Sequence, residues 1–186
     1  MPASVCIANG ASSQSLHGLR GRVVRYAALA GRQLFSIIFI IASAGHFSPQ
    51  TIEAAARHGV PLPGLLVPVS GIIALLGGLS VLLGYQTRLG AWLLVIFLVP
   101  VTVMMHNFWS APDVISAQIE KAMFLKNVTM LGGALVISYF GAGPLSLDAV
   151  VQRGKDLSHD ARVVSPLPDV RSDYPPVREG RGRAVR

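Results

Sequence analysis

Cysteine and charged residues are both scarce in this chain. Cys6 is the single cysteine among 186 residues, so neither an intramolecular disulfide nor a dithiol redox pair can form. Any redox chemistry must therefore use another group. Charged residues make up 13% of the chain, against about 25% in an average soluble protein. The basic residues mostly flank a long apolar region instead of lining a soluble face, which disfavours nucleic-acid binding.

Apolar residues are abundant instead, at 52% of the chain, and they gather in four long runs. Each run reaches the roughly 20 residues that a helix needs to cross the hydrocarbon core of a bilayer. The sequence therefore predicts an all-α, polytopic membrane protein with four transmembrane helices in one bundle. The predicted spans are residues 26–47, 65–85, 89–109 and 122–143.

The segments outside this block have a different composition. Residues 1–22 are rich in Ser, Ala and Gly without periodicity, and no basic region precedes an apolar core as in a cleaved signal. Residues 151–186 are basic and contain four prolines. We expect disordered tails at 1–22 and 151–186 around a membrane domain at 23–150, with a short amphipathic helix near residues 146–153.

Two connections lie between the spans on one side. The segment from Ser48 to Gly59 is typical of a surface helix, with Ser48 as N-cap, Pro49 at the first helical position and Gly59 at the C-terminal cap. Glu53 and Arg57 would pair across one turn. Residues 110–121 are expected to form a short polar connection.

The flanking charges predict an orientation. Four arginines precede or begin the first span, Arg88 separates the second from the third, and eight Lys or Arg residues follow the fourth. All three groups lie on one side if the number of spans is even. By the positive-inside rule that side is cytoplasmic, so both termini should lie on the cytoplasmic side of the membrane.

With this topology, several polar residues fall at a similar depth near the outer surface. They form the candidate ligand site, and residues of the predicted surface helix could cover it. Lys126 and Asn127 are expected to face a polar pocket inside the bundle, since an ionisable group within a span is usually functional. His46 and His106 are equally well explained as interfacial residues. The site comprises His46, His106, Asn107, Lys126 and Asn127, and the lid Arg57 and His58.

A second polar layer is predicted on the inner side. It contains Arg32, Arg88 and Asp148, and either arginine could pair with the carboxylate. We interpret these residues mainly as anchors that fix the orientation of the helices at the interface.

Several segments together resemble the DoxX family of small four-helix membrane proteins, over about residues 30–150. They are Arg32–Leu34, Gly45–Phe47, Leu76–Leu79, Leu83–Ala91, Lys126–Gly133 and Gly141–Asp148. The resemblance implies a bacterial inner-membrane protein, with some members linked to sulfur-compound oxidation, quinone and oxidative-stress complexes. Many relatives carry a Glu before the double glycine of the second span. This chain has Ala74-Leu75-Leu76 there, so no role of that Glu carries over.

Three functions are consistent with these observations. The first is a membrane subunit of a quinone-linked redox complex, in which the histidines and Lys126 serve the quinone and a partner subunit supplies the redox centre. The second is a non-enzymatic scaffold or assembly factor, and the third, less favoured, is a small-solute transporter. No metal site is predicted, and haem between His46 and His106 is disfavoured because both lie near helix ends. The bilayer is the expected surrounding, and association with further copies of the chain is left open.

Overall fold

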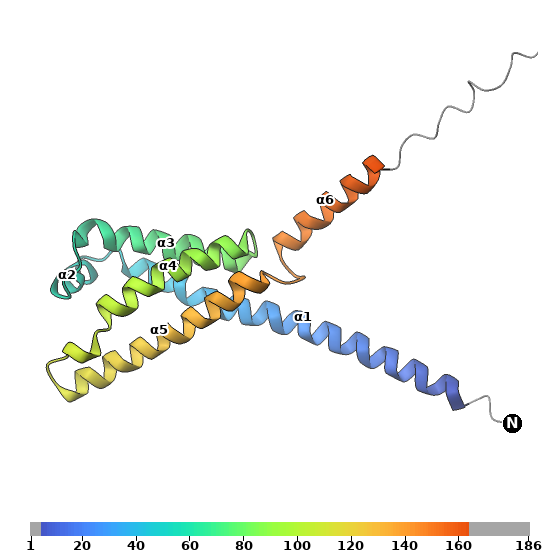
Figure 1. Cartoon of the computed structure of the whole chain (residues 1–186), viewed down its shortest axis with the longest axis horizontal. Coiled ribbons are helices and arrows are strands. Elements are labelled where there is room, and N and C mark those ends of the chain that lie inside the picture. The colour runs from blue at the N-terminus through green and yellow to red at the C-terminus, as the bar shows by residue number, and fades with distance from the viewer. Residues whose placement is uncertain (1–4, 164–186) are drawn as a thin grey trace, which may run out of the picture. The chain divides into compact units, whose positions relative to one another are not determined.

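A computed structural model describes the backbone of residues 5–163 and the side chains from Leu19 to Asp160 (Figure 1). These residues form helices and no strand, which confirms the all-α prediction. The chain divides into one unit that ends at Val151 and another that begins at Gln152. The elements are α1 (Val5–Gly45), α2 (Pro49–Arg57), α3 (Pro63–Leu83), α4 (Thr87–Met105), the 3-10 turn η1 (Phe108–Ser110), α5 (Val114–Phe140) and α6 (Leu147–Val163).

Within the described residues, four helical segments are long and apolar enough to cross a membrane: α1 from Leu19, α3, α4 with η1 to Ser110, and α5. The predicted four spans are thus confirmed, although their ends move. The largest change is in α5, which begins at Val114 and not near residue 122. Its start is fixed by Asp113, whose side chain accepts hydrogen bonds from the backbone N–H and the hydroxyl of Ser116, at 2.9 and 2.7 Å. Most of the expected connection at 110–121 is therefore helical.

Both expected tails also differ from the structure where it describes them. Residues 5–22 are helical and continue into the first span, since no proline lies between Pro2 and Pro49 to end the helix. An existing helix also extends without the cost of a new nucleus. Likewise α6 runs to Val163, ten residues beyond the expected end of the short helix. The rest of the predicted C-terminal tail, residues 164–186, lies outside the described residues.

The surface helix predicted after the first span is confirmed as α2. The Ser48 hydroxyl accepts from the N–H of Thr51 at 3.3 Å, and Pro49 occupies the first position. Gly59 has φ of +76°, which suits glycine, and its N–H and that of Val60 donate to the carbonyls of Ala56 and Ala55 at 3.0 Å. The Glu53–Arg57 pair forms at 2.9 Å on the surface.

The four spans pack in the order α1, α3, α4, α5, each mainly against the next. Glycines set two of the contacts. A Cβ on Gly78 of α3 would lie 3.0 Å from Ile40 of α1, and one on Gly77 would lie 2.8 Å from Leu94 of α4. The centre holds Phe39, Ala74, Val81, Ala91, Leu94, Phe97, Leu98 and Ala134. Because the spans alternate in direction, one end of this unit carries His46 and His106, and the other Arg32 and Arg88. These are called the His46 end and the Arg32 end below.

Candidate functional site

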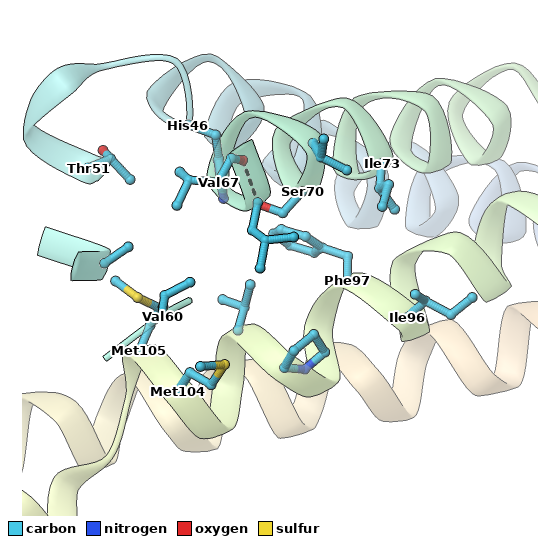
Figure 2. Close-up of a pocket in the computed structure, with 15 residues that line it drawn as sticks. His46, Thr51, Val60, Val67, Ser70, Ile73, Ile96, Phe97, Met104 and Met105 are labelled. Atoms are coloured by element: carbon cyan, nitrogen blue, oxygen red, sulfur yellow. Dashed lines mark hydrogen bonds between the residues drawn. The ribbon is translucent and has the colours of Figure 1, made fainter. Parts of the chain in front are cut away.

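An apolar cavity of about 320 Å³ lies at the His46 end, between the end of α1 and helices α2, α3 and α4 (Figure 2). Its size falls within the range of small-molecule sites. Three polar side chains line it, those of His46, Thr51 and Ser70. The other lining residues are apolar: Ala55, Val60, Leu66, Val67, Val69, Ile73, Ile96, Phe97, Pro100, Val101, Met104 and Met105.

His46 follows the last residue of α1 and is held by two neighbours. A Cβ on Gly71 would lie 2.6 Å from the His46 Cβ, so only glycine at this position of α3 leaves room for the histidine. The imidazole also meets the Phe97 ring edge to face, with centroids 5.5 Å apart. Phe97 in turn contacts Phe39 of α1. The packing therefore fixes His46 at the wall of the cavity.

The hydrogen bond of His46 determines what the ring can offer to a ligand. Its Nδ1 lies 3.0 Å from the carbonyl oxygen of Ala42. A carbonyl only accepts, so Nδ1 carries the proton in the neutral ring and Nε2 carries the lone pair. Neutral His46 can thus accept a hydrogen bond from a hydroxyl group, whereas the protonated ring can donate one to a carbonyl.

A second, polar groove of about 580 Å³ also lies at the His46 end. It combines the predicted lid residues Arg57 and His58 with Asn107, Ser116 and Glu120. Glu120 accepts from Nδ1 of His106 at 2.8 Å, and the two side chains are 22% (His106) and 31% (Glu120) exposed. His58 is held by a contact of 2.8 Å between its Nδ1 and the Ala54 carbonyl. Three of the predicted polar residues, Arg57, His58 and Asn107, therefore line this groove together with Glu120, which the sequence did not predict and which also contacts His106.

Lys126 and Asn127 are separated from both of these places. Asn127 is buried, at 5% exposure, and faces the interior as expected. Lys126 is exposed, and its ammonium contacts the sulfur of Met123 at 3.3 Å. The expectation that both face an interior pocket therefore fails for Lys126, while Asn127 is buried but lines neither the cavity nor the groove described above. Neighbouring residues of a helix point about 100° apart, and here that angle separates interior from surface.

At the Arg32 end, the buried Arg32 holds the chain that follows α5. Its two terminal nitrogens donate to the carbonyls of Ala142 and Leu145, at 2.6 and 2.9 Å. Its buried Nε has no hydrogen-bond partner among the described residues. Arg88 is exposed and lies beside Gly141, where a Cβ would be 3.7 Å from its Nε.

Asp148 holds the start of α4. Its carboxylate accepts from the N–H groups of Gln86 and Thr87, at 2.7 and 3.0 Å, and from the Thr87 hydroxyl at 2.9 Å. Burial by itself would raise the pKa of Asp148. The hydrogen bonds from Thr87 and Gln86, together with the charge of Arg32, hold this pKa below its usual value. Asp148 therefore acts as a cap supplied from outside the helix, and neither Arg32 nor Arg88 forms the predicted ion pair with it among the described residues.

Sequence reasoning missed Glu120, Gly71 and Phe97. Glu120 could have been found as the single acidic residue inside a spanning helix, had the start of that helix been read from the Asp113 cap. Gly71 and Phe97 carry no such signal, because glycine and phenylalanine are ordinary in membrane spans. Among the described residues, no three His, Cys, Asp or Glu side chains are arranged to hold a metal ion.

Comparisons with known proteins agree with this architecture. Residues 27–107, which run from within α1 to just past α4, match the family model described as DoxX. The chain is 26% identical over 125 residues to the inner membrane protein YqjF of Escherichia coli (strain K12), covering 67% of this chain and 92% of YqjF. It is 27% identical over 99 residues to the inner membrane protein YphA of the same organism, covering 53% of this chain and 69% of YphA. No solved structure matches the chain.

Proposed function

We propose that this chain, which belongs to the DoxX family through residues 27–107, is an inner-membrane subunit of a redox complex. In this proposal the chain binds a quinone or quinol at His46. The inner-membrane location is carried over from the two Escherichia coli relatives, which are named as inner membrane proteins. The observation that carries the proposal is the apolar cavity with one histidine at its wall.

The rim of the cavity supports a ligand that arrives from the lipid. Leu66, Val69 and Ile96 line the cavity and are also exposed on the surface of the spans, at 42%, 39% and 58%. In a bilayer these side chains meet acyl chains, so a lipid-soluble molecule can enter sideways without crossing water. A quinone has this solubility and also carries two oxygens that need hydrogen-bond partners.

The tautomer of His46 supports a role in proton exchange. In the neutral ring, Nε2 accepts the hydroxyl proton of a bound quinol, and the resulting imidazolium can return a proton to a quinone carbonyl. Oxidation of a quinol to a quinone releases two electrons and two protons. His46 takes one proton, water at the His46 end takes the other, and a partner subunit receives the electrons because this chain has no dithiol pair.

The test is binding of decyl-ubiquinone, a short-tailed quinone, to the purified full-length protein in detergent. His46→Ala should weaken binding about tenfold, the effect of losing one hydrogen bond to a buried ligand. The matched control is His58→Ala, which removes a histidine from the polar groove and not from the cavity. Binding that is absent in the unmodified protein, or equal in both variants, would refute the proposal.

The same proposal places both termini in the cytoplasm. The Arg32 end carries Arg88, and the part of α1 that precedes it carries Arg20, Arg22 and Arg25, so the positive-inside rule puts this end on the cytoplasmic side. In a Cys6→Ser background, a cysteine at position 88 should resist a membrane-impermeant maleimide in intact cells, and one at position 110 should react. The reverse labelling would invert the topology.

A further inference from the structure

We propose that the exposed face of α5 formed by Ala122, Lys126 and Thr129 docks a transmembrane helix of a different membrane protein, and that this helix carries an Asp or Glu side chain at the depth of Lys126. This face is called the Lys126 face below. The inference concerns a partner and not the cavity ligand, so loss of quinone binding would leave it unaffected.

The first support is the place of α5 at the edge of the packed spans. Only 11% of the residues in the most apolar stretch of α5 are buried inside this chain, whereas the corresponding share is 33% in α3 and in α4. It packs chiefly on α4, and a close approach to α1 occurs at Gly133, where a Cβ would lie 2.8 Å from the Phe35 ring. Gly133 is seven residues after Lys126 and therefore lies on nearly the same side of α5, two turns away. On that side Ala122, Lys126 and Thr129 are exposed, so this part of α5 is open to a further helix.

The second support is the depth of Lys126. Glu120 meets His106 just after the last residue of α4, at the His46 end of the spans. Lys126 lies six residues further along α5, about 9 Å deeper at 1.5 Å per residue. Its contact within the described chain is the Met123 sulfur, a weak acceptor for an ammonium group. A charge at this depth is costly in lipid unless an acceptor of opposite charge meets it.

The third support is the shape around the lysine. Ala122 and Thr129 lie one turn before and one turn after Lys126 on the same face, and all three are exposed. The Thr129 hydroxyl donates to the Leu125 carbonyl of its own helix at 3.0 Å, so it does not project as a free polar group. Small residues on both sides of a lysine let a neighbouring backbone come close enough for the ammonium to reach a carboxylate.

The composition of the chain indicates that the partner is not a second copy. Among the described residues, Glu120 is the one acidic residue inside a spanning helix, and its carboxylate already accepts from His106. A second copy would bring another lysine to the face and no free carboxylate at its depth. The matching acid must come from another protein.

The experiment places a photo-crosslinking benzoylphenylalanine at Ala122 in the full-length chain, in native membranes, and leaves Lys126 intact. The expected product is a crosslink to a transmembrane peptide of another protein that contains Asp or Glu. Lys126→Ala should lower the yield of this product about tenfold, as expected for a polar contact between helices in a membrane. Lys126→Glu should restore it when the partner's acidic residue is replaced by Lys.

Lys121→Ala is the matched control. Lys121 is an exposed cation of the same helix that points about 140° away from Lys126, so its removal should leave the yield unchanged. The crosslinker at Val128, also exposed but on another side of α5, should give no such product. The proposal is overturned by a crosslink to a second copy, by lipid adducts alone, by a partner peptide without an acidic residue, or by a Lys126→Ala yield equal to that of the unmodified chain.

Discussion

Replacing Asp148 with alanine should destabilise the four-helix unit by removing the cap at the start of α4. That helix begins at Thr87 after Gln86, which has a φ of +47° and makes no capping hydrogen bond with its own side chain. The two N–H groups at this end instead donate to Asp148, which lies more than sixty residues later in the chain. One side chain therefore ties the turn between α3 and α4 to the segment after α5.

The expected loss is about 2–3 kcal/mol in the free energy of unfolding. Three hydrogen bonds are lost, each contributing about 1 kcal/mol net, and a charged acceptor raises that value. Water can reach part of this half-buried site and replaces some of the interaction. Loss of an N-terminal cap in other helices costs about 0.5–2 kcal/mol, which sets the lower part of the range.

A second substitution isolates one of the three bonds. Thr87→Val keeps the shape of a fully buried side chain and removes its hydroxyl, so it should cost about 1 kcal/mol. Because Asp148 then has one partner fewer, Asp148→Ala should cost about 1 kcal/mol less in the Thr87→Val background than in the unmodified chain.

The assay is reversible unfolding of the purified protein in mixed micelles, followed by circular dichroism as the denaturing detergent increases. Asp156→Ala is the control, because Asp156 is an exposed acid of the same helix α6. The reasoning is refuted if Asp148→Ala lies within about 0.5 kcal/mol of the unmodified protein, which is the usual range for surface substitutions. Equal losses for Asp148→Ala and Asp156→Ala would refute it as well.

Three further predictions use the same assay. The pKa of Asp148 is lowered from its usual value of 3.8. The stability that Asp148 contributes is therefore complete above about pH 3.8 and is lost as the pH falls through the lower pKa of the folded state. Asp148→Asn should flatten this acid-dependent loss of stability. Gly77→Ala should cost about 1–3 kcal/mol because the new Cβ would lie 2.8 Å from Leu94, whereas Gly132→Ala should leave stability unchanged or raise it by up to about 1 kcal/mol. A Gly132 loss as large as that of Gly77 would contradict the packing. Glu120→Gln should cost less than about 1 kcal/mol because the contact between Glu120 and His106 is partly solvated, and a loss above about 3 kcal/mol would contradict that account.

The sequence was sufficient to predict four spans, because each contains an apolar run that matches the thickness of a bilayer. The ends of the apolar runs did not predict where the helices begin and end. The polar first turns of α5 belong to a helix that Asp113 begins, and hydropathy does not detect them because it follows lipid contact and not hydrogen bonding. The same limit applies to residues 5–22, where a polar segment is helical without an apolar pattern.

The sequence predicted how deep in the membrane the residues of the candidate site lie, but not which way their side chains point. Topology places His46, His106, Lys126 and Asn127 toward one end of the helices, but it does not say which way each side chain points. In a soluble helix the apolar stripe would give that direction, whereas in a membrane the lipid and the bundle interior are both apolar. Asn127 and Lys126 therefore look alike in the sequence, although one is buried and the other exposed.

Three of the six segments that carry the family resemblance lie at the Arg32 end, where they contact one another. Gly84 leaves space for the Arg32 guanidinium, since a Cβ there would lie 2.9 Å from it, and the Gly84 carbonyl accepts from the N–H of Asp148 at 2.8 Å. Hydrogen bonds thus join three parts of the chain at this end: Arg32, the turn that includes Thr87, and the loop from Gly141 to Asp148. A substitution in any one of these three parts leaves a polar group in one of the other two without its hydrogen-bond partner. The cavity at the His46 end depends instead on separate apolar side chains, which can be exchanged one at a time without this penalty. The Arg32 end should therefore tolerate single substitutions less well than the apolar lining of the cavity does.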